Sequence, residues 1–443
     1  MLLPLLLSAF LQATQVEAKV DDKSLIDTAD EVGKEVEALR KSKFKQAVKK
    51  GVYTEAELRK YLEKKAFEEE YGGGKLEKSQ AFLRLSGLIP PTCDLKQTFL
   101  DVLLNQVGGF YDPDTKAFYM LKRQGADYGP LLTRTMIAHE LTHALDDQYF
   151  DLARVMKALE RTEDWSLAVQ SVTEGSATAL MFQYMTQAQQ SGKYDTDDLK
   201  KVAEQEAERG KVLFEAPPYF ATLAATYTCG MNFLLKGKGM MALMQEEGAQ
   251  VGERVRDCIR DLPRSTEQIL HPAKYWDKAQ RDDPIEVQDD VAAGLVARSG
   301  RTILHKDTLG EMLCALLTHS KKWKLDANRM AASAFWTNPA ASGWGGDRFF
   351  LLTGAKDPKS WEKEPQSLCG VWLTAWDTPK DRTEFLEALA QRPVAGRSEP
   401  ILLGDKAAGF VFQGSEAMAA ELKQGLPGAA ATLFRRAGAP WAP

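Results

Sequence analysis

Two histidines four residues apart, with a glutamate beside the first, are the feature that most limits how this chain can fold. They are His139, Glu140 and His143, an HExxH pattern within residues 134–147. Residues four apart lie on one face of an α-helix, so both imidazoles can reach one Zn²⁺. Glu140 points in another direction, where it can take a proton from a metal-bound water. The spacing therefore predicts a helix that carries two zinc ligands and a general base.

Three fixed positions in five residues also occur by chance, so the flanking residues matter. Apolar residues give the segment a broad hydrophobic surface: Met136, Ile137, Leu141, Ala144 and Leu145. This pattern predicts a buried helix, where an unpaired histidine or glutamate is costly. The alternative is a core helix whose histidines hydrogen-bond to the backbone. Burial favours the metal site over this alternative.

A catalytic zinc site needs a third protein ligand and an open position for water, whose pKa then falls to about 7. Glu174 is the strongest candidate, on a second predicted helix that can return antiparallel to the first. The small residues Gly175, Ser176 and Ala177 allow two helices to approach closely. The alternative is a solvated helix carboxylate. Competing third ligands are Asp146, Asp147, Asp151, Glu160, Glu163 and His271. Asp147, four residues after His143, could instead orient a ligand histidine or be a surface charge.

The HExxH helix with a later glutamate resembles the gluzincin class of zinc metallopeptidases, to which thermolysin belongs. The resemblance implies His139, His143 and Glu174 as the metal ligands. The sequence departs from thermolysin-like enzymes at Thr178, where they place an aspartate. This departure leaves that supporting residue unassigned.

A second resemblance is to a poorly characterised group of bacterial metallopeptidases that are secreted or lipid-anchored. The shared stretches are residues 109–113, the HExxH helix, Glu174–Gly175, residues 265–272 with Lys274 and Tyr275, residues 343–348, and Trp376 with Asp377. Together they span roughly residues 85 to 390. This resemblance implies a zinc fold and peptidase activity without naming a substrate.

A β-hairpin is predicted for residues 107–121, directly before the HExxH helix. Two aromatic runs flank Asp112-Pro-Asp-Thr, which has turn chemistry. In gluzincin-like folds such a strand forms the rim of the cleft, where an extended peptide can pair with its edge. An ordinary sheet strand is the compatible alternative.

Amide cleavage also needs a donor aimed at the oxygen that becomes negatively charged. His271 is the first candidate and Tyr275 the second. The alternative is a helix start capped by Ser265 or Thr266, with Glu267 nearby. Residues 343–348 contain three glycines in four positions and predict a loop. Asp347 in that loop could orient His271, but a role in fixing the loop itself is favoured.

The first 18 residues resemble a signal peptide, because an apolar run too short to span a bilayer precedes polar residues and Ala18. They lack the usual basic start. No cysteine follows closely for a lipid anchor, and no later stretch can cross a membrane, so we expect a secreted or periplasmic protein. The five cysteines lack metal-type spacing and allow one or two disulfides. A net charge of −5 with mixed signs argues against nucleic acid as a partner.

The expected organisation has four parts. After the signal peptide, residues 19–84 read as a helical N-terminal arm, which would be a propeptide or a lid. Residues 85–345 carry every candidate site residue and would form a mainly helical, zincin-like catalytic domain with a small β-hairpin. Residues 346–443 predict a small α+β region with strands near 349–352, 371–376, 401–403 and 409–413 and a helix over 383–391. The fold class is therefore α+β.

The sequence as a whole favours a zinc metallopeptidase that acts on a peptide or protein substrate. Two alternatives remain at this level. One is a catalytically silent zinc-fold protein with a binding or structural role in the cell envelope, which metal removal would destabilise without loss of any activity. The other is hydrolysis of a substrate other than a peptide. The intact Glu140 argues against the silent protein.

Overall fold

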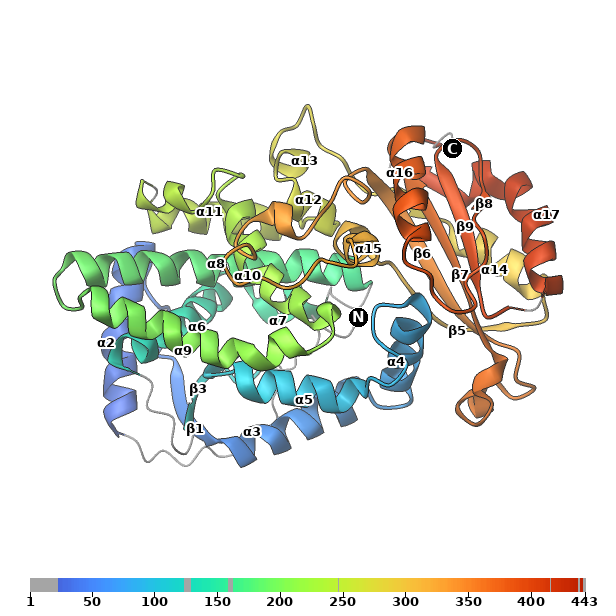
Figure 1. Cartoon of the computed structure of the whole chain (residues 1–443). Coiled ribbons are helices and arrows are strands. Elements are labelled where there is room, and N and C mark those ends of the chain that lie inside the picture. Colours follow the sequence, from blue (N-terminus) through green and yellow to red (C-terminus); the bar gives the residue numbers. More distant parts are fainter. Residues whose placement is uncertain are drawn as a thin grey trace.

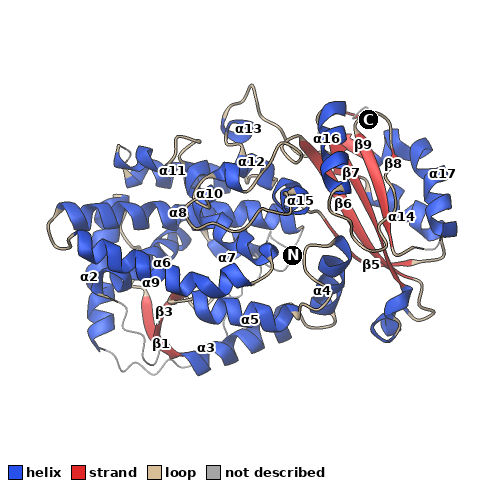
Figure 2. Ribbon diagram, viewed as in Figure 1, coloured by secondary structure: helices blue, strands red, loops and turns tan. Residues whose placement is uncertain are grey.

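The computed structural model of this chain describes residues 23–122, 129–157, 162–245, 247–414, 416–436 and 439–440. Helices dominate the first two thirds of the chain, and an antiparallel sheet flanked by helices forms the last third (Figures 1 and 2). The α+β fold class expected from the sequence is confirmed. The predicted signal peptide, residues 1–18, lies outside the described residues.

The N-terminal region is not purely helical, although residues 19–84 predicted a helical arm. Its elements are α2 (Lys23–Arg40), β1 (Lys49–Thr54), α3 (Glu55–Leu62), the π-helix η1 (Glu63–Glu70) and α4 (Lys75–Ser86), followed by α5 (Leu95–Gln106). Strand β1 pairs in parallel with β3 (Ala117–Lys122). The sequence pattern missed β1 because its partner lies more than sixty residues away. The N-terminal region is thus built into the core of the helical part.

The predicted hairpin is confirmed. Strand β2 (Gly109–Asp112) pairs antiparallel with β3, and the three-stranded sheet has the order β1-β3-β2. Asp112 accepts hydrogen bonds from the backbone N–H groups of Asp114 and Thr115, so the aspartate itself closes the turn. Strand β2 is an edge strand of this small sheet. The helix that carries the histidines follows β3 in the chain.

The central helices come next in the chain. They are α6 (Pro130–Phe150), α7 (Leu152–Lys157), α8 (Glu163–Gln190), α9 (Thr196–Glu215), η3 (Pro218–Ala221), α10 (Thr222–Leu234), η4 (Met240–Met244), α11 (Gly248–Arg260), α12 (Thr266–Leu270) and α13 (Ala273–Trp276). Helix α8 is buried continuously over residues 166–180. It is the axis of the helical part, with α6 and α10 packed against it (Figure 1).

Two glycines set the distance between α8 and α10. A Cβ added to Gly175 would lie 2.2 Å from the carbonyl carbon of Gly230, and one added to Gly230 would lie 1.9 Å from the Ser171 carbonyl oxygen. Both distances are far below van der Waals contact. The two helix backbones therefore touch directly, which fixes α10 against the segment of α8 that carries Glu174.

The last third of the chain begins with β4 (Glu286–Val287) and α14 (Asp289–Arg298). It continues with β5 (Thr302–Asp307), α15 (Gly310–Thr318), η5 (Ser333–Phe335), β6 (Trp344–Thr353), η6 (Pro358–Lys363), η7 (Pro365–Ser367), β7 (Leu368–Trp376), α16 (Pro379–Ala390), β8 (Ile401–Leu402), β9 (Ala407–Phe412), α17 (Glu416–Leu433), β10 (Phe434–Arg436) and β11 (Ala439–Pro440). The main sheet has the order β5-β6-β7-β9-β8, and every neighbouring pair is antiparallel. The strands and helix predicted for this region are confirmed.

Alternate residues of β6 serve two different cores. Phe349 and Leu351 pack with α4 and α16, whereas Phe350 and Leu352 pack with α14 and α17. Helices thus cover both faces of the sheet (Figure 2). Because β5 belongs to this sheet and β6 begins at Trp344, the expected boundary at residue 346 falls inside a strand.

The loop predicted for residues 343–348 is wrong, since most of this segment starts β6. A Cβ on Gly343 would lie 2.2 Å from Asp381 Cγ, and one on Gly346 would lie 2.1 Å from the Ile285 carbonyl oxygen. The glycines therefore permit close packing instead of a turn. Asp347 is buried and accepts hydrogen bonds from the backbone N–H groups of Leu309 and Gly310 and the indole N–H groups of Trp344 and Trp372. It fixes local structure and does not contact His271.

All five cysteines lie in the described part of the chain and are free thiols, four of them buried. The disulfides that the sequence allowed are not formed. Within the described ranges, no helix is both long enough and apolar enough to span a bilayer.

Candidate metal centre

The two histidines of α6 and the glutamate of α8 meet in the middle of the helical part. Helices α6 and α8 run antiparallel, since Arg134 hydrogen-bonds to Tyr184 at one end and Ser176 to Asp146 further along. His139 Nε2 lies 3.2 Å from His143 Nε2 and 3.2 Å from Glu174 Oε2. His143 Nε2 lies 3.5 Å from Glu174 Oε2. The structure thus brings all three predicted ligands together.

These distances suit one small cation held by three ligand atoms. Ligands at about 2.0–2.2 Å in a tetrahedral arrangement lie about 3.3–3.6 Å from one another. The two buried Nε2 atoms face each other, and a cation between them would accept a lone pair from each. Two nitrogens and one carboxylate oxygen form a donor set that zinc and related transition metals accept. The residues therefore fit a divalent metal, although the geometry alone does not choose the element.

His143 and Glu174 strongly shift each other's pKa values. Burial lowers the pKa of His143, but the charge and hydrogen bond of Glu174 outweigh it and raise the pKa to about 9. Burial raises the pKa of Glu174, and the two histidines overcome this effect and lower it to about 2. The site thus attracts positive charge, and a bound cation would replace the proton on the imidazole.

Glu140 lies next to the triad and faces a cavity of about 580 Å³. Its Oε2 accepts a hydrogen bond of 3.0 Å from the backbone N–H of Tyr111 in β2. Burial raises the pKa of Glu140, while the neighbouring histidines oppose this shift. The hairpin therefore holds the carboxylate beside the metal ligands, where a general base is needed.

The cavity extends along α6 and α8 on both sides of the triad. Its wall also includes β2, α5, α9 and α10. One end is apolar and is lined by Leu132, Met136, Met181, Met185, Leu199 and Val202. The other end is lined by Leu152, Gln170, Thr173 and Thr228. Its volume is typical of a site for a small molecule or a few residues of peptide.

Tyr227 of α10 is a site residue that the sequence interpretation missed. Its ring stacks on His139 with centroids 5.5 Å apart, and its hydroxyl lies close enough to Glu174 for the charge of that carboxylate to act on it. Burial, followed by the charges of Glu174 and Glu140, raises the pKa of Tyr227 well above 10, so the hydroxyl keeps its proton. A signal existed in the sequence: Gly230 lies one turn away and matches Gly175 as a small residue for close helix packing.

The two aspartates after the HExxH motif have structural partners. Asp147, considered as a support for a ligand histidine, accepts hydrogen bonds from the Tyr111 hydroxyl, the Lys116 ammonium and the Leu152 backbone N–H. It ties α6 to the hairpin. Asp146 pairs with Arg40 of α2 at 2.7 Å and also binds Ser176 of α8. Neither aspartate is in the metal triad.

Two further alternative ligands, Glu163 and Asp151, do not join His139 and His143 either. Glu163 accepts a hydrogen bond from the Tyr219 hydroxyl, and Asp151 caps the end of α6 in a left-handed conformation. Glu160 lies outside the described residues. Among the residues that the structure describes, Glu174 is the acidic group that completes a metal cluster with the two histidines.

His271 and Tyr275, expected as donors to the reacting carbonyl, are not brought to this site. Neither lines the cavity. His271 Nε2 lies 2.9 Å from Glu311 Oε1, and the Tyr275 hydroxyl donates to the Asp261 carbonyl oxygen. Ser265 caps α12 by accepting from the Gln268 N–H, as the alternative interpretation held. Residues 265–275 therefore have structural contacts that hold α12 and α13 in place beside the sheet region.

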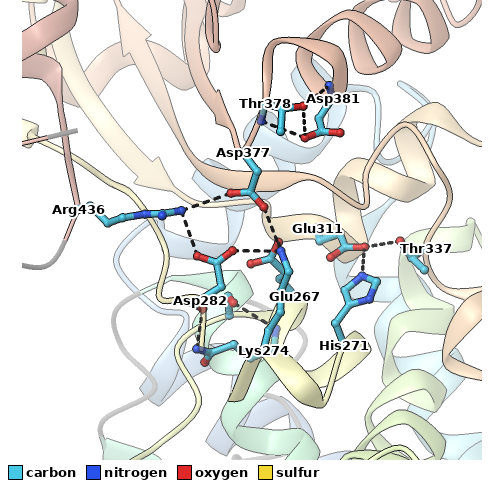
Figure 3. A network of polar contacts seen from close by, with 12 residues as sticks. Glu267, His271, Lys274, Asp282, Glu311, Thr337, Asp377, Thr378, Asp381 and Arg436 are labelled. Atoms are coloured by element: carbon cyan, nitrogen blue, oxygen red, sulfur yellow. Dashed lines mark hydrogen bonds and ion pairs between the residues drawn. The ribbon is translucent and has the colours of Figure 1, made fainter. Parts of the chain in front are cut away.

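Figure 3 shows the polar network at that junction. Lys274 Nζ lies within 3.1 Å of carboxylate oxygens of Glu267, Asp282 and Asp377. Arg436 contacts Asp282 and Asp377 from the other side. The three carboxylates are close enough to hold a cation, but the Lys274 ammonium already lies among them. This network joins residues 267–282 to Asp377, which lies far away in the sequence.

Comparison with known protein families gives a match to another part of the chain. A family model described as a domain of unknown function (DUF8575) matches residues 298–425. This range holds strands β5 to β9 and part of α17, and it excludes the HExxH helix and Glu174. No curated protein matches the chain, and no solved structure matches it. The matched domain is less than a third of the chain and bears no known activity.

Proposed function

We propose that this protein is a zinc-dependent hydrolase of peptide bonds. One observation carries the proposal: His139, His143 and Glu174 converge within 3.5 Å of one another, with Glu140 beside them in one cavity. Two imidazoles, one carboxylate and a separate glutamate are the groups that zinc-assisted hydrolysis needs. A zincin-like catalytic core is part of the same proposal.

The chain's own groups divide the reaction between them. Zinc bound by the triad would lower the pKa of a coordinated water to about 7 and polarise the scissile carbonyl. Glu140 removes a proton from the attacking water and later delivers it to the leaving amine. Tyr227, which keeps its proton, donates a hydrogen bond to the carbonyl oxygen as negative charge develops there. Tyr227 thereby takes the role first expected of His271 or Tyr275.

The hairpin supports a peptide as the substrate. Strand β2 is an edge strand of the small sheet, and its residues Gly109, Phe110 and Tyr111 line the cavity. The Tyr111 N–H faces the site, because it donates to Glu140. An extended peptide can add to such an edge through main-chain hydrogen bonds and so place one of its carbonyls beside the triad. Secretion or a periplasmic location, predicted from residues 1–18, belongs to the same proposal.

The test compares metal content and peptide cleavage in the wild type, Glu140→Gln and His143→Gln. We expect about one zinc per chain in the wild type and Glu140→Gln, and far less in His143→Gln. We expect cleavage of a broad peptide library by the wild type alone, since general base catalysis contributes about 10²–10⁴-fold. Absence of zinc from the wild type would refute the ligand assignment. Equal cleavage by Glu140→Gln would refute the role of Glu140.

A catalytically silent zinc-fold protein with a binding or structural role is the second candidate. The close integration of the site with α2, α8 and the hairpin favours it, because a bound metal would stabilise all of them together. It predicts that a chelator lowers the melting temperature while neither the wild type nor Glu140→Gln cleaves any peptide. Cleavage by the wild type would exclude this candidate.

A further inference from the structure

One polar side chain in the cavity wall has no hydrogen-bond partner among the residues that the structure describes. Gln170 lies in α8, one turn before Glu174, and is 1 % exposed. Within the described part of the chain, neither Oε1 nor Nε2 of Gln170 has a hydrogen-bond partner. Buried amides are nearly always paired in folded proteins. An unpaired amide in the wall of a cavity therefore points to a ligand that supplies the partners.

The direction of the helices places Gln170 relative to the metal triad. Because α6 and α8 are antiparallel, Met136 and Met185 lie toward one end of the cavity and Gln170 toward the other. The triad lies between these ends. A bound chain that presents a carbonyl to the triad would thus extend toward the apolar wall on one side and toward Gln170 on the other.

Three other polar groups that line the cavity already have partners. Thr173 donates its hydroxyl to the backbone carbonyl of Gln170, Thr228 donates to the backbone carbonyl of Met330, and Glu140 accepts from the Tyr111 N–H. Among these residues, Gln170 alone has both a donor and an acceptor that are not paired with any described residue. The Gln170 donor and acceptor are both uncharged. A peptide unit complements them, because it also has one uncharged donor and one uncharged acceptor.

We propose that Gln170 binds a main-chain peptide group of the substrate, next to the bond presented to the triad. The side-chain oxygen and nitrogen of Gln170 are buried by protein atoms in this structure. The terminal torsion of glutamine varies over a broad range, so rotation can turn the amide toward a bound substrate. A turn of this torsion is therefore part of binding. The inference rests on the proposed function for its substrate class, but binding can be measured without cleavage.

The experiment measures the dissociation constant of N-acetyl-leucyl-leucinamide by calorimetry. This probe has two uncharged peptide groups, no charged ends and apolar side chains. The full chain carries Glu140→Gln to prevent cleavage and is titrated with and without Zn²⁺. Adding Gln170→Met, which keeps the length but removes the amide, is expected to weaken binding about 10-fold. Zinc content and melting temperature are expected to stay unchanged.

Thr178→Val is the matched control. Thr178 of α8 also has a buried side-chain oxygen to which no described residue hydrogen-bonds, but it follows Glu174 in the sequence and does not line the cavity. Its substitution is expected to leave the dissociation constant unchanged. If Gln170→Met does not fold, Gln170→Asn keeps an amide but shortens the reach, and it too is expected to weaken binding.

Two results would overturn the inference. Equal affinity of the Gln170 variants and their parent means that the amide serves the fold, for example through a buried water. Failure of the probe to bind the parent at all means that the cavity does not take a neutral peptide. Neither result depends on cleavage, so a failed peptidase assay leaves this test intact.

Discussion

At the scale of single residues, Tyr227 is the sharpest test of the proposed chemistry. Tyr227→Phe removes the hydroxyl but keeps the ring on His139. We expect kcat to fall by about 10²-fold, because one donor to the developing charge contributes about 3 kcal/mol, while zinc content stays unchanged. Steady-state kinetics on a cleaved peptide measure this. Tyr219→Phe, which removes a buried hydroxyl bound to Glu163, is the control for a merely structural loss. An unchanged kcat in Tyr227→Phe would remove it from the mechanism.

His319 gives the folded protein a dependence on acid. Burial, followed by the charges of Arg392 and Arg329, lowers the pKa of His319 from 6.5 to about 4. The unfolded chain therefore takes up a proton at this residue below pH 6.5, and the folded chain does so only near pH 4. Its contribution is present above pH 6.5 and is lost as the pH falls toward 4, by up to about 3 kcal/mol.

We expect His319→Phe to lose less of its unfolding free energy than the wild type between pH 7 and pH 4.5. Urea unfolding of both proteins at both pH values measures the difference. Phenylalanine keeps a ring against Trp323, on which His319 stacks at 4.4 Å. Parallel losses in the two proteins would show that other groups cause the acid sensitivity.

Sequence alone could predict the site residues that share one helix or one strong chemical type. Helical spacing places His139 and His143 together, and a later glutamate beside small residues points to Glu174. Tyr227 could not be placed in the same way, because it joins the site through the contact of Gly175 with Gly230. The sequence predicted His271 at the site from its residue type and from its neighbours Pro272 and Tyr275. Histidine chemistry does not reveal which neighbour, here Glu311, a histidine meets.

At the scale of secondary-structure elements, the contact of α8 with α10 is the critical one. Gly230→Ala would place a methyl group 1.9 Å from the Ser171 carbonyl oxygen, a backbone atom that cannot move alone. Overpacking of this kind costs about 1–3 kcal/mol or more and exceeds the gain of about 1 kcal/mol in helix propensity. We expect a net loss of unfolding free energy and weaker zinc binding, measured by urea unfolding and metal titration.

Gly294→Ala is the matched control for that substitution. Gly294 lies within α14, and in the part of the chain that the structure describes a Cβ there would meet nothing within 4 Å. We expect this variant to gain about 0.5–1 kcal/mol from helix propensity alone. A similar gain in Gly230→Ala would show that α8 and α10 can separate at little cost.

The elements that sequence could predict are those whose signal is local. The hairpin of β2 and β3 carries its own turn, and β7 and β9 are short apolar runs. Strand β1 was missed because a parallel partner distant in sequence defines it. A loop is predicted for residues 343–348 because three glycines in four positions suggest unusual backbone angles or close backbone approach. In the structure the close approach of Ile285 and Asp381 requires them.

At the scale of the whole molecule, Arg40 joins the N-terminal region to the metal centre. Arg40 of α2 is buried and pairs with Asp146, three residues after His143. Arg40→Met leaves that buried carboxylate without its partner, which costs about 3–5 kcal/mol. Urea unfolding measures the loss. We expect Arg40→Met combined with Asp146→Asn to recover most of it, because no charge is then left unpaired. A double variant as unstable as the single one would mean that packing dominates.

The same pairing bears on the interpretation of residues 19–84 as a propeptide or lid. Helix α2 packs on α6 and α8, and β1 completes the small sheet, so both contribute to the buried core. A segment with these contacts is part of the folded unit on which the site is built. Its removal would expose the side of α6 and α8 opposite the cavity.

Lys274 joins the helical part to the sheet and makes that junction sensitive to pH. Burial raises the pKa of Glu267, and the Lys274 ammonium 2.6 Å away opposes this shift. Lys274→Met removes the ammonium that contacts Glu267, Asp282 and Asp377, while Arg436 still contacts the two aspartates (Figure 3). The burial of Glu267 and the repulsion among the three carboxylates then lose the compensation that Lys274 gave. We expect a loss of about 3–5 kcal/mol at pH 8.

The loss in Lys274→Met should shrink as the pH falls. Without the ammonium, the pKa values of Glu267 and Asp377 rise further, so both carboxylates take up protons in the folded protein and the repulsion disappears in acid. Urea unfolding at pH 5 and pH 8 measures this, with Lys380→Met as the control, since Lys380 is exposed and its pair with Glu384 is worth at most about 1 kcal/mol. A loss independent of pH would assign the role of Lys274 to its alkyl chain, and the junction would then be held by packing instead of charge.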